Sequence, residues 1–238
     1  MADRERRAAD TSTGRVAGAA GSPLGDPEGR RGSEALAALA AEAGACRRCE
    51  LYRRATGTVF GEGRAGAAVM LCGEQPGDRE DLSGHPFVGP AGKLLDRAVE
   101  LAGLRRDELY VTNAVKHFKW EERGTRRLHQ RPNRAEIAAC KPWLEGELVA
   151  VGPSVVAAMG ATAAEVLLGT GFRVTRHRGE SIDAAVGAWS GLVVPTVHPS
   201  SVLRITDHDE REAAFDSFVA DLRALAHAAT LDGAARPG

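Results

Sequence analysis

Residues 67–73 (AAVMLCG) form an uninterrupted apolar run that ends directly before the charged residue Glu74. A short run without polar alternation is typical of a strand that is buried on both faces of a sheet. Residues 192–198 (LVVPTVH) have the same character, and residues 108–113 (ELYVTN) and 154–160 are further strand candidates. We therefore expect a mostly parallel central sheet.

Helical patterns separate these strands. Residues 90–103 are amphipathic, with proline at the start and glycine at the end. Asn133 precedes Glu136 by three residues, which predicts a capped helix that continues to about residue 149. Further helices are expected over residues 33–44, 162–168 and 209–226. Alternating strands and helices predict an α/β fold, a three-layer α/β/α sandwich around the sheet.

The chain has 238 residues, of which 43% are hydrophobic, enough for one large domain over residues 34–230. Residues 1–33 are rich in Gly, Ala, Arg and Ser, and we expect them, like residues 231–238, to be disordered. No apolar run spans a membrane and no signal peptide begins the chain, so we expect a cytoplasmic protein. No apolar helical face is left over, which favours a monomer.

Three polar residues follow predicted strands: Glu74, Asn113 and His198. In open α/β sheets the ligand crevice lies at the carboxyl ends of the strands. We therefore expect these side chains to converge on one site, although each taken singly could be a solvated loop residue.

The four cysteines suggest a metal or cluster site, because a disulfide framework is unusual in the cytosol. Cys72 lies within the first strand and is expected to be a core residue. Cys46, Cys49 and Cys140 remain as thiolate ligands, and His117 is the best candidate for a fourth. The residues favour an iron–sulfur cluster over a Cys3His zinc site only modestly, and His117 could also be an ordinary loop histidine.

Residues 116–134 (KHFKWEERGTRRLHQRPNR) carry seven basic and two acidic residues, with Phe118 and Trp120 among them. Basic and aromatic side chains together suit single-stranded or distorted nucleic acid, whereas a solvated loop is the plainer alternative. A second basic patch is formed by Arg173, Arg176, His177 and Arg178. The net charge of −1 excludes a globally basic nucleic-acid coat.

Four motifs follow one another in a recognisable order: residues 73–77 (GEQPG), 85–92 (HPFVGPAG), 112–116 (TNAVK) and 198–204 (HPSSVLR). In this order and spacing they resemble the motifs of family 4 uracil-DNA glycosylases, which carry a [4Fe-4S] cluster. The resemblance covers about residues 40–225. It implies a three-layer α/β/α glycosylase fold, in agreement with the independent prediction from the strands and helices.

Two departures point to a subgroup. Gln75 stands where family 4 generally has Ala, and His117 where it has Cys. Residues 125–129 (TRRLH) resemble the Lys-Arg-Arg-Ile-His loop of the UdgX class, whose members excise uracil and stay covalently attached to DNA through the loop histidine. The matching residue is His129. The resemblance also implies that the [4Fe-4S] cluster is held by Cys46, Cys49, His117 and Cys140.

The resemblance implies a role for each motif residue. Phe87 would stack on the flipped uracil, and the amide of Asn113 would pair with N3–H and O4, a pattern that cytosine reverses. His198 would stabilise charge at O2, Glu74 would oppose the cationic sugar or activate the nucleophile, and His129 would attack C1′. Further contacts to the substrate are expected from Gln75, Arg127, Ser200 and Arg204.

The expected partner is uracil-containing DNA, in single-stranded form at least. Three alternatives stay open. The protein could be a conventional glycosylase that turns over, with His129 only contacting DNA. It could be a single-strand DNA-binding module without catalysis, which would not distinguish uracil from thymine. It could also be a zinc protein with a degenerate site.

Overall fold

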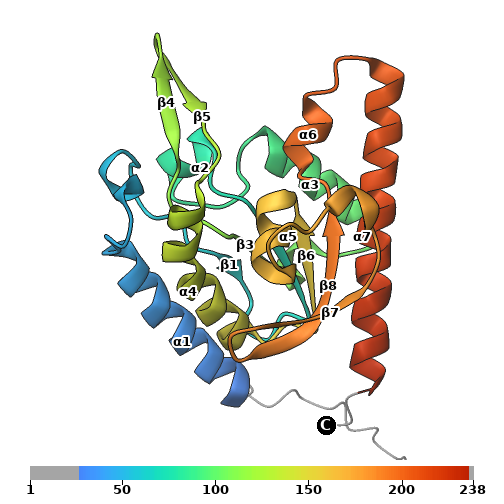
Figure 1. Ribbon diagram of the computed structural model, residues 1–238. Coiled ribbons are helices and arrows are strands. Elements are labelled where there is room, and N and C mark those ends of the chain that lie inside the picture. Colours follow the sequence, from blue (N-terminus) through green and yellow to red (C-terminus); the bar gives the residue numbers. More distant parts are fainter. Residues whose placement is uncertain (1–26, 236–238) are drawn as a thin grey trace, which may run out of the picture.

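A computed structural model describes residues 27–235 and shows a six-stranded sheet between two layers of helices (Figure 1). The strand order is β1-β3-β2-β6-β8-β7, in which β2, β3, β6 and β8 are parallel and the two edge strands are antiparallel to their neighbours. The predicted α/β sandwich with a mostly parallel sheet is confirmed. The strands are β1 (Glu62–Gly63), β2 (Val69–Gly73), β3 (Tyr110–Asn113), β6 (Val155–Met159), β7 (Ile182–Val186) and β8 (Trp189–Thr196).

Both faces of the sheet are buried, which explains the apolar run in β2. Val69 and Leu71 pack in a core with α3 (Pro90–Leu101) and α7 (His208–Ala235). Met70 and Cys72 point to the opposite face and pack with α4 (Arg134–Val151) and α5 (Ala161–Leu168). Cys72 is fully buried, and this burial raises the pKa of its thiol to about 12, in agreement with a core residue.

Two helices extend further than the sequence predicted. Helix α1 (Pro27–Gly44), which lies along α4, begins before residue 33, and α7 continues past residue 226 (Figure 1). Residues 27–33 and 231–235, which we expected to be disordered, are therefore helical. The same expectation for residues 1–26 and 236–238 lies outside the described residues.

The predicted cap of α4 is present. The Asn133 side chain accepts a hydrogen bond from the Glu136 backbone N at 2.9 Å, and Glu136 Oε2 accepts one from the Asn133 backbone N at 2.7 Å. This reciprocal pair satisfies two donors at the start of the helix. It also fixes where the preceding basic segment ends.

The basic segment is a β-hairpin and not a loop. Strands β4 (Trp120–Arg123) and β5 (Arg126–His129) pair antiparallel, with Trp120 opposite His129. Gly124, with φ of 62°, begins the two-residue turn between them. The hairpin projects from the end of the molecule where the parallel strands finish (Figure 1).

The remaining elements are short. They are α2 (Asp78–Ser83), α6 (Pro199–Leu203) and three 3-10 turns, η1 (Glu50–Arg53), η2 (Arg106–Glu108) and η3 (Val174–Arg176). Across the described residues, no helix is both long and apolar enough to cross a membrane.

Candidate active site

A cavity of about 110 Å³ lies at the carboxyl ends of β2 and β3, where the sequence predicted a site. Gly73 lies directly behind two of the side chains that line it, because a Cβ there would lie 2.4 Å from Asn113 Oδ1 and 2.8 Å from Phe87 Cζ. Only glycine allows this close approach. The cavity is lined by Gln75, Pro76, Gly77, Glu80, Phe87, Ala91, Asn113, His129, His198 and Ser200.

Asn113 is the last residue of β3 and its side chain lies at this cavity, with only 3% of the residue exposed. Its Oδ1 atom is buried and has no hydrogen-bond partner among the described residues. An unsatisfied buried acceptor costs about 1–3 kcal/mol. The position is therefore suited to accept an N–H group from a bound ligand.

Phe87 forms a wall of the cavity in an unusual backbone conformation. Its φ is 58°, which bulky residues rarely adopt. Gly92 permits this turn, because a Cβ at Gly92 would lie 1.6 Å from the Phe87 carbonyl oxygen. The Phe87 ring stacks near His198, with centroids 6.3 Å apart and planes inclined at 28°.

His198 caps α6 and presents one ring nitrogen to the cavity. Its Nδ1 accepts a hydrogen bond from the Ser200 backbone N at 3.2 Å, which leaves the ring proton on Nε2. Nε2 lies 3.4 Å from the position that a Cβ on Gly73 would take, and so lies near Asn113 Oδ1 and the Phe87 ring. Burial, followed by the charges of His129 and Arg204, lowers the pKa of His198 to about 4. Near neutral pH the ring is therefore a neutral N–H donor.

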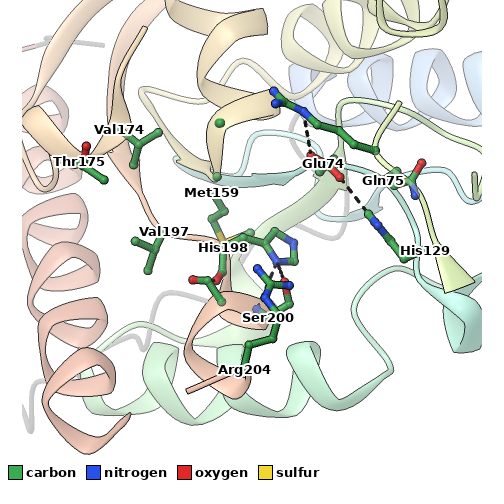
Figure 2. A pocket seen from close by; sticks show the side chains of 14 residues that line it. Glu74, Gln75, His129, Met159, Val174, Thr175, Val197, His198, Ser200 and Arg204 are labelled. Carbon is green, nitrogen blue, oxygen red and sulfur yellow. Dashed lines mark hydrogen bonds and ion pairs between the residues drawn. The ribbon is translucent and has the colours of Figure 1, made fainter. Parts of the chain in front are cut away.

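A larger cleft of about 460 Å³ adjoins the cavity and shares His198, His129, Gln75 and Ser200 with it. Glu74 lies in this cleft and accepts a hydrogen bond from Thr162 Oγ1. Arg131 Nε lies 3.9 Å from Glu74 Oε2, and His129 Nε2 lies 3.5 Å from Glu74 Oε1 (Figure 2). The carboxylate is thus held between a hydroxyl, a guanidinium and an imidazole.

His129 is the last residue of β5 and its side chain is about half exposed. Burial and then the charge of Arg204 lower its pKa, although the Glu74 carboxylate acts in the opposite direction. The neighbouring arginines of the hairpin are not the cause of the lowered pKa of His129. Arg126 is exposed, and the guanidinium of Arg127 is turned toward α2, so the cause is different.

Arg127 and Gln75, two of the residues predicted to contact substrate, both hold the hairpin in this structure. Arg127 lies 2.6 Å from Asp78 Oδ1 and 2.6 Å from Asp81 Oδ2, and its guanidinium stacks over the rings of Phe118 and Trp120. These contacts occupy the side chain and leave it little freedom to reach DNA.

The side-chain amide of Gln75 joins the two stems of the hairpin. Its Nε2 donates to the carbonyl oxygens of Lys119 and Gln130, both at 3.1 Å, and its Oε1 accepts from the Lys119 N at 3.1 Å. Because Gln130 follows His129 directly, this clamp sets the position of His129 relative to Glu74. Of the expected substrate residues, Gln75, Ser200 and Arg204 line the cleft and Arg127 does not. Arg204 Nη1 donates to Ser200 Oγ at 3.2 Å.

Of the four predicted cluster ligands, the three cysteines lie in one apolar cluster and His117 is not part of it. Cys46, Cys49 and Cys140 belong to one apolar cluster with Trp143, whose Nε1 lies 3.3 Å from Cys46 Sγ. Burial, and to a smaller extent the charges of the other two thiolates, raises the pKa of Cys140 to about 11. Within residues 27–235, however, no three His, Cys, Asp or Glu side chains are close enough to hold a metal ion.

His117 is buried and its Nε2 lies 3.0 Å from Thr58 Oγ1, which is its hydrogen-bond partner. Burial lowers the pKa of its ring. The three cysteines fit a thiolate-bound group in residue type, but within residues 27–235 they are not gathered closely enough to hold one. His117 would have to give up its contact with Thr58 to use Nε2 as a ligand.

Sequence reasoning missed a buried ion pair behind the site. Lys116, counted among the basic residues of the hairpin segment, is fully buried, and its Nζ lies 2.5 Å from Glu147 Oε2. The same ammonium donates to Thr112 Oγ1 and to the Asn113 carbonyl oxygen, both at 2.6 Å. The apolar neighbours of Lys116 in the motif TNAVK were the available signal, because they place it against the core.

The fold and this site define a member of the uracil-DNA glycosylase superfamily. The family model described as "Uracil DNA glycosylase superfamily" matches residues 60–223, and the chain belongs to this family. The "Type-4 uracil-DNA glycosylase" of Thermotoga maritima is 35% identical over 174 residues, which cover 72% of this chain and 84% of that protein. The "Type-4 uracil-DNA glycosylase" of Sulfurisphaera tokodaii is 34% identical over 175 residues, which cover 71% and 76% of the two chains.

Proposed function

We propose that this protein excises uracil from DNA and then becomes covalently attached to the sugar through His129. One observation carries the proposal: His129 Nε2 lies 3.5 Å from the Glu74 carboxylate, at the edge of a cavity where Asn113 Oδ1 has no partner in the described part of the chain. The relatives named type-4 uracil-DNA glycosylase support the excision of uracil. The resemblance of residues 125–129 to the loop of the UdgX class supports the covalent step.

Base recognition would use the cavity after the uracil has left the helical stack. Asn113 Oδ1 would accept N3–H of uracil, and its amide nitrogen would donate to O4. Cytosine presents the opposite donor and acceptor at these positions, and each missing buried hydrogen bond costs about 1–3 kcal/mol. Phe87 would stack on the ring. These contacts favour uracil over cytosine.

Bond cleavage would begin as the electron pair of the C1′–N1 bond moves onto uracil. His198 Nε2–H donates to O2, where negative charge develops, and Glu74 opposes the positive charge on the sugar. The lone pair of unprotonated His129 Nε2 then bonds to C1′. The products are an alkylated imidazolium, compensated by Glu74, and a uracil anion that takes up a proton from water.

The three cysteines support a second part of the proposal, that the chain binds a [4Fe-4S] cluster through Cys46, Cys49, Cys140 and His117. When bound, the cluster would join the segment around Cys46 to α4 and so support both ends of the hairpin. Visible charge-transfer absorption, with iron and sulfide content of the purified protein, would test this part. A colourless protein that contains zinc would contradict it.

The covalent step is tested by incubating the protein with single-stranded DNA that contains one uracil, followed by a denaturing gel. We expect a protein–DNA band that survives detergent and heat in the wild type and is absent in His129→Ala, which should release uracil and leave an abasic site. Free abasic DNA from the wild type would make the protein a glycosylase that turns over, with water activated by Glu74. Intact uracil DNA would overturn excision itself.

A further inference from the structure

The segment between α5 and β7 borders the cleft on the side away from the hairpin. Val174 and Thr175, in η3, line the cleft together with His198 and Arg204, and in Figure 2 they lie on the opposite side of it from His129. Val174 is buried, which fixes η3 to the core. A DNA strand whose uracil nucleotide occupies the cleft can therefore run from the hairpin toward η3.

A second hollow, of about 390 Å³, is formed by residues 168–173 with Arg176 and His177. Gly169 and Gly171 have φ of 104° and 86°, and a Cβ at either position would meet nothing within 4 Å. The backbone of this loop therefore faces open space and can be approached closely by a ligand.

Two arginines at this hollow have no acidic partner among residues 27–235. In the basic patch predicted from the sequence, Arg178 Nε donates to Asp221 Oδ2 at 2.9 Å, and His177 Nδ1 lies 2.9 Å from Glu180 Oε2. Arg173 and Arg176 are exposed, and neither makes an ion pair with the part of the chain that the structure describes. The residues that line the hollow include no carboxylate, so its charge is positive.

An aromatic surface accompanies this charge. The rings of Phe172 and His177 lie 5.2 Å apart at an angle of 37°, and both side chains line the hollow. Guanidinium groups beside an aromatic face are the combination that holds the backbone and bases of single-stranded DNA. The hollow therefore combines two arginines without an acidic partner among the described residues, a glycine-containing loop that faces open space, and an aromatic ring.

We propose that this hollow is a second binding site for the DNA strand whose uracil enters the cavity beside the cleft. Arg173 and Arg176 hold a backbone phosphate, and the neighbouring nucleotide rests against Phe172. The site rests on the proposed function, because the same strand passes from it into the cleft. It extends recognition to nucleotides on one side of the uracil, so an added tail on that side strengthens binding.

The test measures how strands extended on one side bind to the full-length protein. Fluorescence anisotropy gives the affinity for a short thymine strand and for the same strand extended at its 5′ or its 3′ end. Gel assays give the capture rate for the matching uracil strands below saturation. The test variant is Arg173→Ala/Arg176→Ala. The control is Arg64→Ala/Arg106→Ala. It removes the same number of positive charges, at residues that precede the amino ends of β2 and β3.

We expect one of the two extensions to increase affinity and capture for the wild type and the control, and the test variant to show no such gain. Its slope of log affinity against log salt should be shallower by roughly 0.7, the value for one phosphate that the protein no longer neutralises. Capture of the short uracil strand at saturation should stay unchanged.

Two outcomes overturn the second site. One is an equal reduction of the extension gain in both double variants, and the other is an extension gain that the test variant keeps. If the protein does not excise uracil but the extension still increases its affinity for the thymine strand, and Arg173→Ala/Arg176→Ala abolishes this gain, only the proposed function is overturned.

Discussion

Under the proposed function, Asn113 would favour recognition at the expense of stability. Its buried oxygen has no partner within residues 27–235, and such an atom costs about 1–3 kcal/mol. We expect Asn113→Ala to raise the melting temperature, by roughly 2–4 °C for each kcal/mol regained. The same change should slow uracil excision at least about tenfold, because the base loses its hydrogen bonds.

Thermal unfolding and single-turnover excision, measured on the same preparation, check this prediction. Phe87→Leu is a useful comparison, because it keeps the unpaired oxygen but removes an aromatic wall. A lower melting temperature for Asn113→Ala would show that the amide holds the cavity together in the absence of a ligand.

The two histidines predict different responses to pH. Burial lowers the pKa of both, and that of His198 falls to about 4. Each ring therefore gains its proton at a lower pH than a free histidine, which does so at about pH 6.5. Covalent capture should be constant from neutral pH down to about 6.5 and should decline in more acid solution as His129 becomes protonated and loses its nucleophilic lone pair.

Capture rates measured in single turnovers between pH 4.5 and 8 would check this, and excision by His129→Ala supplies the control. Excision by that variant depends on His198 and should persist to more acid pH than capture does in the wild type. Coincident profiles for the two reactions would contradict a separate role for His129.

At the scale of elements, the hairpin is attached to the site by the Gln75 amide. Gln75→Ala removes three hydrogen bonds to the stems at Lys119 and Gln130, while Glu74 keeps its contact with Thr162. We expect excision to continue and covalent capture to slow, so that a larger share of the DNA becomes abasic without being attached. The ratio of attached to abasic DNA on a denaturing gel measures this partition.

Gln130→Ala is the matched control, because it removes an amide of the same size whose backbone oxygen, and not its side chain, meets Gln75. Its ratio should equal that of the wild type. Equal ratios for all three proteins would mean that the hairpin holds His129 without the clamp.

The elements also show which parts of the fold could be predicted. Strand β2 and the second half of β8, residues 193–196, are buried on both faces, so their apolar runs mark them in the sequence. Strands β4 and β5 are mostly exposed and charged, and no hydrophobic period distinguishes them from a loop. Motif residues could be assigned to the site, but the contacts of Arg127 and Gln75 depend on where the hairpin folds back, which local sequence does not determine.

At the scale of the whole molecule, the Lys116–Glu147 pair connects distant parts of the chain. Glu147, on α4, accepts hydrogen bonds from the Gly61 backbone N, from Tyr110 Oη and from Thr112 Oγ1. Lys116 N donates to Cys140 Sγ at 3.1 Å, so the pair also adjoins the proposed cluster ligands. The sheet edge, the end of β3 and the cysteine region thus share one buried charge network.

Removing one charged partner of this pair should lower the free energy of unfolding more than removing both. Lys116→Met leaves the Glu147 carboxylate buried without its cation, a change that costs about 3–5 kcal/mol, whereas replacing both charged partners can be close to neutral. In Lys116→Met/Glu147→Gln, the glutamine still has an oxygen for the donors at Gly61 and Tyr110. We therefore expect the double variant to be more stable than Lys116→Met.

Urea denaturation of the wild type, both single variants and the double variant gives the coupling free energy. Destabilisations that simply add would contradict a mutually dependent pair.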